Sequence, residues 1–402
     1  MAAGNAAPRG ADTRHAATVS PPGAHNAQEE SYYVASQWKL IGRKFRRHKL
    51  SMVSLCVLGL MYLGAILCEF LAPYDPAQRF ERYLYCPPQR VHFIDASHRF
   101  HLRPFTYGLK QTLDMVSLVR TYQEDTAVSY PVRFFVHGSP YKFWGLVRTS
   151  VHFFGVGDAS GGGATATGDT SGGTIFLFGT DKLGRDLFTR NLAASRISLT
   201  VGLVGVAISF VLGSLIGGVS GYFGGRLDTF IQRTIEILLS IPTIPLWMGL
   251  AAALPPDWPS IKVYFGITII LAIIGWSGLA RVVRGRLLEL REEDFVMAAR
   301  ISGASSLSII VRHLLPSFMS YLIVNLTLSI PYQILGETAL SFLGLGLQPP
   351  VVSWGVLLHD AQNLATIAFH PWLLLPAVWI VVTVLMFNFL GDGLRDAADP
   401  YR

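Results

Sequence analysis

One stretch decides the fold class of this chain: residues 197–225, ISLTVGLVGVAISFVLGSLIGGVSGYFGG. It contains no charged residue, and it exceeds the roughly 20 apolar residues that a helix needs to span a bilayer. Small residues let helix backbones approach closely in lipid. The glycines concerned are Gly202, Gly205, Gly213, Gly217, Gly218 and Gly221. We therefore expect a transmembrane helix at the centre of a helix bundle.

Five further charge-free runs have a similar character: residues 50–68, 237–256, 263–280, 314–336 and 371–391. The whole chain is 51% hydrophobic and only 15% charged, whereas soluble globular chains are about 25% charged. The sequence thus predicts an all-α polytopic membrane protein with six transmembrane helices.

The first apolar run follows a basic segment and a long tail. Because more than forty residues precede it and no small-residue cleavage site follows it, we interpret residues 36–72 as a basic segment and an uncleaved first transmembrane helix. Residues 1–35 are rich in Ala, Gly and Pro and show no periodicity, which predicts a disordered cytoplasmic tail.

The distribution of Lys and Arg predicts the orientation. Arginines gather before the first run, after the second run and throughout 281–312, whereas 337–370 has no Lys or Arg. Short positively charged loops stay in the cytoplasm, so both termini are expected to be cytoplasmic. The net charge of +7 follows from this bias and gives no support to a nucleic-acid partner.

Residues 73–190 form a long insertion, which we expect to be extracytoplasmic and partly irregular. Its aromatic and β-branched runs at 132–136, 147–154 and 175–178 predict short strands. The Gly-rich tract 158–173 lacks the Gly-Lys-Ser/Thr ending of a phosphate-binding loop and is interpreted as a flexible linker. In residues 179–186, which have the pattern of a turn followed by a helix start, Asp181 is a candidate N-cap for a helix along the outer membrane face.

No metal or catalytic constellation stands out. The histidines are scattered without ligand spacing. Cys56, Cys68 and Cys86 lack paired spacing; inert thiols are favoured, with a Cys68–Cys86 pairing as the alternative. We predict no catalytic residue, no metal and no cofactor in this chain.

The Arg-rich segment 284–316 is a candidate docking element. Ala298, Ala299, Gly303 and Ala304 give a small-residue face, and the pair Leu315–Pro316 closes the segment before the fifth run. Small residues allow another protein surface to approach this backbone. We expect a short helix, a turn at Gly303 and a second helix that Pro316 ends.

At these residues the chain resembles the membrane subunits of ATP-binding-cassette importers, whose cytoplasmic loop carries Glu-Ala-Ala, three residues, Gly, and a terminal Leu-Pro. Met297 replaces the Glu, and His313 stands at an Ile position. Further motifs look like the second (C-type) permease subunit of the dipeptide/oligopeptide/nickel group. They are GTDKLGRD at 179–186, GYFGGRLD at 221–228, SFLGLG at 341–346, SWG at 353–355 and GDGLRD at 391–396.

The resemblance implies a MetI-like permease core of five helices in residues 191–402, in a multi-pass protein of the bacterial inner membrane. It implies four kinds of contact: a second homologous permease subunit, two ATPase subunits that hold ATP and Mg, an extracytoplasmic solute-binding protein, and membrane lipid. It also implies transport of peptides, with a glycoside, an opine or a metal chelate as alternative solutes.

Ionisable residues and prolines at membrane depth are candidates for the translocation pathway. Glu236 precedes Pro242 and Pro245, which can break a helix beside a cavity, and Glu337 follows the fifth run. The alternative for both glutamates is a buried pairing, with Arg233 or with a neighbouring helix.

Two other classes of protein would require patterns of their own. An ion-coupled secondary transporter requires inverted repeats or a coupling-ion site, and a membrane enzyme requires converging nucleophiles or metal ligands. The sequence shows neither pattern, so the importer subunit is the preferred interpretation.

Overall fold

The computed structural model describes residues 37–113, 115, 120–156 and 173–398. The predicted tail 1–35 and all but the last residue of the predicted linker 158–173 lie outside the described residues. Helices dominate the structure. They are α2 (Gln37–Arg47), α3 (Lys49–Ile66), α4 (Cys68–Leu71), α5 (Leu187–Phe223), α6 (Gly225–Ser240), α7 (Thr243–Ala252), α8 (Ser260–Leu290), α9 (Asp294–Ile301), α10 (Ser306–Ser308), η1 (Ile309–Leu314), α11 (Leu315–Ser317), α12 (Met319–Phe342), α13 (Trp354–His359), α14 (Leu364–Phe369), η2 (Pro371–Leu374) and α15 (Leu375–Ala398).

Among the described residues, four helical segments are long and apolar enough to cross a membrane: α3, α5, α8, and η2 together with α15. Two bent pairs pass the same test jointly. In the first pair, α6 and α7 meet at 89°; in the second, the helical segment 306–317 and α12 meet at 77°. Counting each pair as one span gives the six that the sequence predicts.

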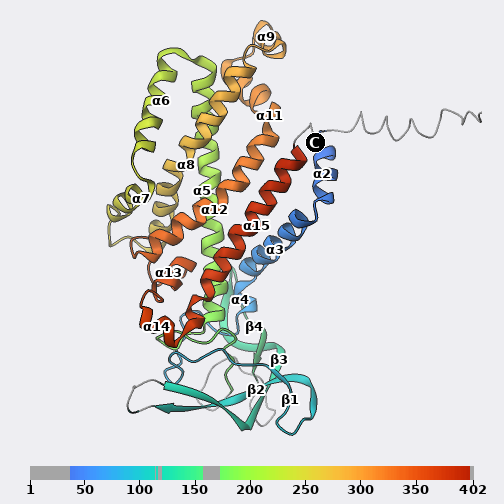
Figure 1. Ribbon diagram of the computed structural model, residues 1–402, viewed down its shortest axis with the longest axis vertical. Coiled ribbons are helices and arrows are strands. Elements are labelled where there is room, and N and C mark those ends of the chain that lie inside the picture. The colour runs from blue at the N-terminus through green and yellow to red at the C-terminus, as the bar shows by residue number, and fades with distance from the viewer. Residues whose placement is uncertain (1–36, 114, 116–119, 157–172, 399–402) are drawn as a thin grey trace, which may run out of the picture.

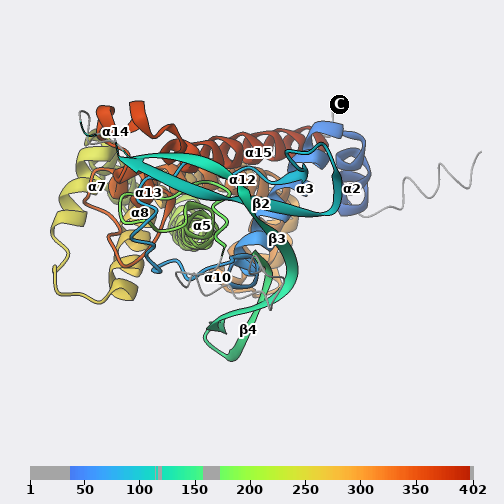
Figure 2. The same ribbon diagram turned by 90° about the horizontal axis from the view of Figure 1, so that it is seen from below.

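The helix α5 is the centre of the bundle, and Figure 2 shows it end-on among α3, α8 and α12. Its glycines bring it very close to α8: a Cβ atom added at Gly217 would lie 2.4 Å from the carbonyl oxygen of Ala280. That distance is below any normal contact, so only glycine allows this approach. The close packing predicted from residues 197–225 is therefore present.

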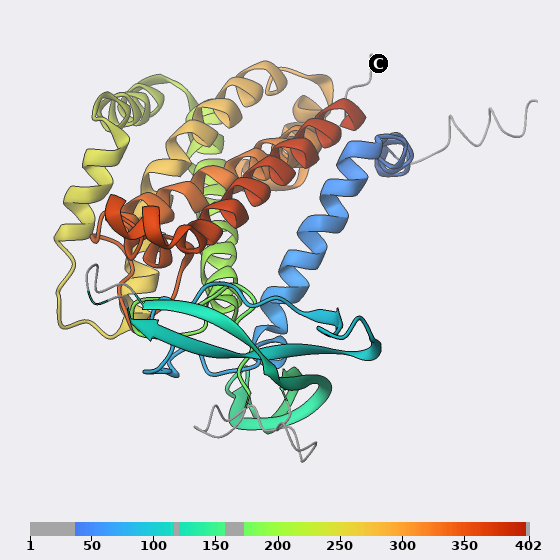
Figure 3. The same ribbon diagram turned by 60° about the horizontal axis from the view of Figure 1, so that its bottom comes forward.

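A four-stranded antiparallel sheet covers one end of the bundle, in the order β1-β2-β3-β4 (Figure 3). Its strands are β1 (His92–Ile94), β2 (Phe100–Leu113), β3 (Arg120–Phe143) and β4 (Val147–Val156). Two predicted strands fall within β3 and β4, but β3 has 24 residues and is not short. The prediction of a strand at 175–178 is wrong: Ile175 and Phe176 are buried in the core beneath the sheet without forming a strand.

The sheet and α9 lie at opposite ends of the bundle (Figure 1). The basic helix α2 and the C-terminal end of α15 lie at the α9 end. The Arg-rich segments of the sequence thus meet on one side, and the insertion lies on the other.

Candidate functional site

The segment between α8 and α12 is a helix, a glycine turn and a second helix. Helix α9 ends where Gly303 takes a φ of +79°, a left-handed conformation that glycine adopts without steric cost. The amide of Ala304 donates to the carbonyl of Ala299 at 3.1 Å, and Ser305 caps the next turn by accepting from the Ser308 amide. The second helix continues through the π-helical η1 into α11 and breaks at Phe318, two residues beyond the predicted stop at Pro316.

One face of this segment packs against the bundle. Val296 of α9 and Ile309, Ile310 and Leu314 of η1 are at most 1% exposed, and they share one cluster with Leu287 of α8. Burial of these side chains contributes about 1.5–3 kcal/mol each. The segment is therefore part of the bundle's packed core and not a loose loop.

The opposite face is open. Met297 is 43% exposed, Ile301 86% and Leu307 59%, and Ala298 and Gly303 lie between them on the surface. The backbone is thus accessible beside apolar side chains, an arrangement suited to a partner surface. Ala299 and Ala304 are half-buried and pack against the buried cluster of Val296, Ile309 and Ile310.

The last two predicted docking residues divide between the faces. Leu315 is 8% exposed and belongs to the buried cluster, whereas Pro316 lies on the surface.

Two arginines connect helices to one another at this end of the bundle. The Arg300 guanidinium of α9 lies 5.1 Å from the ring centroid of Tyr222 on α5, and its Nε donates to the Tyr222 hydroxyl at 3.2 Å. Arg284 of α8 donates to both carboxylate oxygens of Asp228 on α6, at 2.5 and 2.6 Å. Arg300 thus joins α9 to the end of α5, and Arg284 joins α8 to the start of α6.

The two candidate glutamates lie in different environments. Glu337 lies inside α12 and is 0% exposed; it accepts hydrogen bonds from Ser198 of α5 at 3.1 Å and from Ser341 at 2.7 Å. Its pairing is thus with hydroxyl groups. Glu236 lies on the exposed side of α6 and pairs with Arg233 at 2.7 Å, so this ion pair is at the surface and not buried.

A cavity of about 190 Å³ opens between α5, α6, α7, α8 and α12. Leu239 and Thr243, on either side of the α6–α7 break, help to line it, and Pro242 stands at the N-cap of α7. The break therefore lies beside a cavity, as expected from Pro242 and Pro245. Neither Glu236 nor Glu337 lines this cavity.

The polar side of this cavity centres on Gln333 of α12, which sequence reasoning missed. Gln333 is 2% exposed; its Nε2 donates to Ser209 of α5 at 3.4 Å, and its Oε1 has no partner among the described residues. The signal available in the sequence was an amide residue two positions after Pro331 in a charge-free run.

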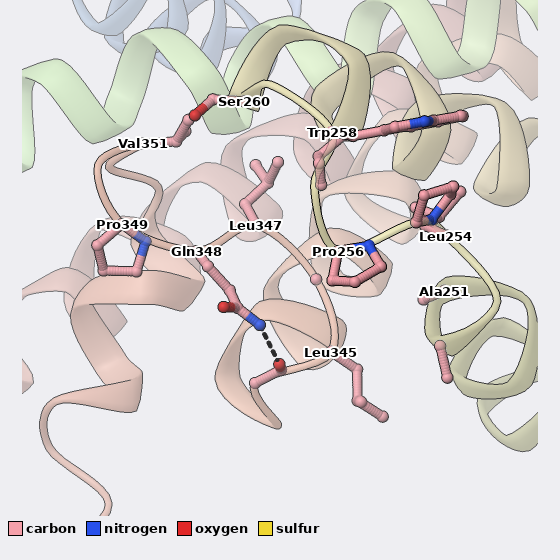
Figure 4. A pocket seen from close by; sticks show the side chains of 15 residues that line it. Ala251, Leu254, Pro256, Trp258, Ser260, Leu345, Leu347, Gln348, Pro349 and Val351 are labelled. Atoms are coloured by element: carbon pink, nitrogen blue, oxygen red, sulfur yellow. Dashed lines mark hydrogen bonds between the residues drawn. The ribbon is translucent and has the colours of Figure 1, made fainter.

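A second cavity, of about 310 Å³, lies between the α7–α8 connection and the loop after α12 (Figure 4). Trp258 and Pro256 form one wall, and Gln348 and Pro349 form the other. The Gln348 side chain is held by a bond from its Nε2 to the carbonyl of Gly344 at 2.8 Å.

The prediction for Asp181 is wrong in its detail. Asp186 is the N-cap, accepting from the Thr189 amide at 2.8 Å, and the helix that it begins is the spanning α5, not a helix along the membrane surface. Asp181 instead accepts from the Arg185 side chain at 2.7 Å and from the buried Arg190. The acidic residue nearest the first apolar position takes the cap.

Within the described ranges, no group of His, Cys, Asp and Glu could hold a metal ion. Cys56, Cys68 and Cys86 are free thiols, with Cys68 and Cys86 buried.

Comparison with known proteins places these features in a family. Residues 209–401 match the family described as "Binding-protein-dependent transport system inner membrane component", and residues 36–88 match the N-terminal TM domain of oligopeptide transport permease C. The dipeptide transport system permease protein DppC of Bacillus subtilis (strain 168) is 44% identical over 56% of this chain and 68% of that protein.

Oligopeptide transport system permease proteins OppC are also similar. That of Haemophilus influenzae is 43% identical over 56% of this chain and 70% of its own length, and that of Bacillus subtilis is 38% identical over 56% and 71%. A solved structure described as inward facing conformations of the MetNI methionine ABC transporter has a TM-score of 0.40 at 20% identity, covering 50% of this chain and 93% of its own.

Proposed function

Because the chain belongs to the family of binding-protein-dependent transport system inner membrane components, we propose that it is the C-type permease subunit of an ATP-driven peptide importer. The relatives named as dipeptide and oligopeptide permeases support the peptide as solute. A multi-pass chain without its own nucleotide site takes the work of transport from an ATPase partner that binds ATP and Mg.

The observation that carries this proposal is the two-faced segment 294–316. Its inner face is packed into the bundle through Val296, Ile309 and Ile310, and its outer face presents Ala298, Gly303 and exposed apolar side chains. A partner that binds the outer face therefore pushes directly on the packed helices.

Coupling requires this face to bind the ATPase with different affinity in two states of the bundle, since equal affinity would shift nothing. Closure of the ATPase subunits would move α9, and Arg300 would transmit that movement to Tyr222 of α5. The expected result is a rigid-body switch between inward-facing and outward-facing arrangements.

The proposed orientation follows from charge. The α9 end and both termini lie in the cytoplasm, because the Arg-rich segments meet there, and the sheet lies outside. A soluble binding protein then delivers solute to the outer end, where the cavity lined by Trp258 and Gln348 lies.

A second, homologous permease subunit is expected against α6. This helix is amphipathic, and Ile235 is its only residue that is fully buried, whereas Phe230 is 71% exposed and Ile237 64%. Two such chains would provide two docking segments for two ATPase subunits.

The polar cavity at Gln333 is the proposed part of the solute path. An unpaired amide oxygen in a low-dielectric site is costly unless it finds a donor, and peptide N–H groups are donors. Pro242 and Pro245 break the neighbouring helix, which gives this wall a place to bend.

The test is reconstitution of the complex in proteoliposomes with peptide and the binding protein. Uptake that requires internal ATP and a co-purifying ATPase and second permease supports the proposal. Uptake that persists without ATP under an ion gradient would replace it with a secondary transporter.

A further inference from the structure

The turn between β3 and β4 is unusually apolar for the tip of an extracytoplasmic hairpin. Its sequence is Phe143-Trp144-Gly145-Leu146-Val147, and Trp144 is 50% exposed, Leu146 86% and Val147 61%. Hairpin tips normally carry Asn, Asp and Gly. Trp144 also holds a φ of +52°, a left-handed conformation that bulky residues rarely adopt. The exposed apolar side chains of this tip therefore suit a partner surface outside the fold.

The position of this turn relative to the first span is fixed by hydrogen bonds. The indole Nε1 of Trp144 donates to the carbonyl of Ile66, the last residue of α3, at 3.0 Å. Its backbone amide donates to Glu69 at 3.0 Å, and Glu69 pairs with Arg196 of α5 at 2.7 Å. The turn is thus tied to the outer ends of two spanning helices.

The length of α3 shows where that end lies in a bilayer. Its 18 residues rise about 27 Å at 1.5 Å per residue, close to the roughly 30 Å of a hydrocarbon core. With Lys49 at one boundary, Ile66 lies at the other. The exposed side chains of the turn therefore lie at the boundary between lipid and water.

The surroundings of the turn match an interface as well. Phe134 and Phe135, 56% and 66% exposed, extend the apolar surface along β3, and Phe135 lies 6.2 Å from Phe70 of α4 between ring centroids. One residue pair behind the tip, the exposed Lys142 and Arg148 face each other across the hairpin. Tryptophan at the boundary with cations beside it is the pattern of interfacial anchors.

We propose that the β3–β4 turn is a membrane anchor. Trp144, Leu146 and Val147 insert into the leaflet on the sheet side, and Lys142 and Arg148 contact lipid phosphates. The apolar surface of α3 continues directly into that of the turn, which makes phospholipid the occupant. The inference depends on the chain spanning a membrane and not on the docking role of 294–316. The depth of a label on the turn and the uptake of peptide therefore test the two proposals separately.

The test places a nitroxide label at Leu146→Cys, in the complete complex carrying Cys56→Ser, in nanodiscs of phosphatidylethanolamine and phosphatidylglycerol. Leu102→Cys is the matched control, because Leu102 is 87% exposed on β2, near the β1 edge that lies away from the bundle (Figure 1). We expect collisions with oxygen to dominate at 146 and collisions with an aqueous nickel chelate to dominate at 102. ATPase activity of each labelled complex reports on its folding.

Equal nickel accessibility at the two positions would overturn the proposal. So would shielding of position 146 only after addition of the binding protein, because the surface would then be a protein-docking surface. A second measurement uses Lys142→Glu with Arg148→Glu: the label at 146 should become several-fold more accessible to nickel in nanodiscs rich in phosphatidylglycerol. No change there would also contradict the anchor.

Discussion

Small and large substitutions of Gly303 have different expected effects: a small side chain strains the backbone, and a large one also adds bulk on the proposed docking face. The φ of +79° makes Gly303→Ala unfavourable by roughly 1–2 kcal/mol, which corresponds to about a 5- to 30-fold change in the population of the native turn. No atom lies within 4 Å of a Cβ built at this position, so a larger side chain meets nothing in its own chain. Gly303→Asn should cost less than Ala, because Asn tolerates the left-handed region.

Gly303→Trp adds bulk where the ATPase is expected to bind. We expect ATP-driven peptide uptake in proteoliposomes to be lost and ATPase co-purification to fall, whereas membrane insertion is retained and the melting temperature falls no further than in Gly225→Trp. Gly225 is the matched control: its φ is +59°, and a Cβ there would also meet nothing within 4 Å. Gly225→Trp should therefore carry similar strain and retain more uptake. Normal uptake by Gly303→Trp would refute the docking role of this turn.

Three further predictions concern the stability of the bundle. Gly217→Ala should destabilise the chain by about 1–3 kcal/mol through overpacking against α8 and lower its melting temperature. Gly278→Ala is the control, because its Cβ would meet nothing within 4 Å, and it should leave the melting temperature unchanged. Equal melting temperatures for the two variants would contradict the close packing. Asp228→Ala and Arg284→Ala should each cost about 1–3 kcal/mol in detergent melts, and the double variant less than their sum; strict additivity would show that the pair does not interact. Burial raises the pKa of Asp186 from 3.8 to about 7, so the folded state keeps a proton that the unfolded chain loses. The stability that depends on Asp186 should therefore be greatest below about pH 4 and fall as the pH rises to 7. The difference in melting temperature between Asp186→Asn and the parent chain should vary with pH over this range, and a difference independent of pH would rule out Asp186 as the source of this pH dependence.

The helical core could be predicted from sequence because the bilayer imposes a simple rule. Charge-free runs of spanning length locate the helices, and the close approach at Gly217 follows from a glycine-rich run. The bend of 89° between α6 and α7 was signalled by Pro242. The break at Phe318 was less clear, because Pro316 is accommodated at the start of a short helix and the chain turns only after it.

The insertion was harder to predict because its strands alternate weakly. Strand β3 mixes exposed Phe134 and Phe135 with buried Val132 and Val136, so its pattern does not show one apolar face. The apolar run at Ile175 resembles a strand but is buried by neighbouring aromatic rings. Burial alone can account for an apolar run, and periodicity cannot distinguish the two cases.

The candidate site was predicted in part. Local chemistry marked Gly303, since a turn between two helices requires a residue that tolerates a positive φ. Gln333 and its cavity could not be predicted, because the cavity is lined by five helices between Val206 of α5 and Gln333 of α12. The environment of Glu337 depends in the same way on Ser198 of another helix.

The interlocking of α5 with α8 has a consequence for how this chain can change shape. Because the carbonyl of Ala280 occupies the space beside Gly217, rotation or sliding of one helix against the other would cause a collision, so α5 and α8 are expected to move together as one rigid body. In the proposed switch, the other helices would then bend relative to this body at Pro242 and at Phe318.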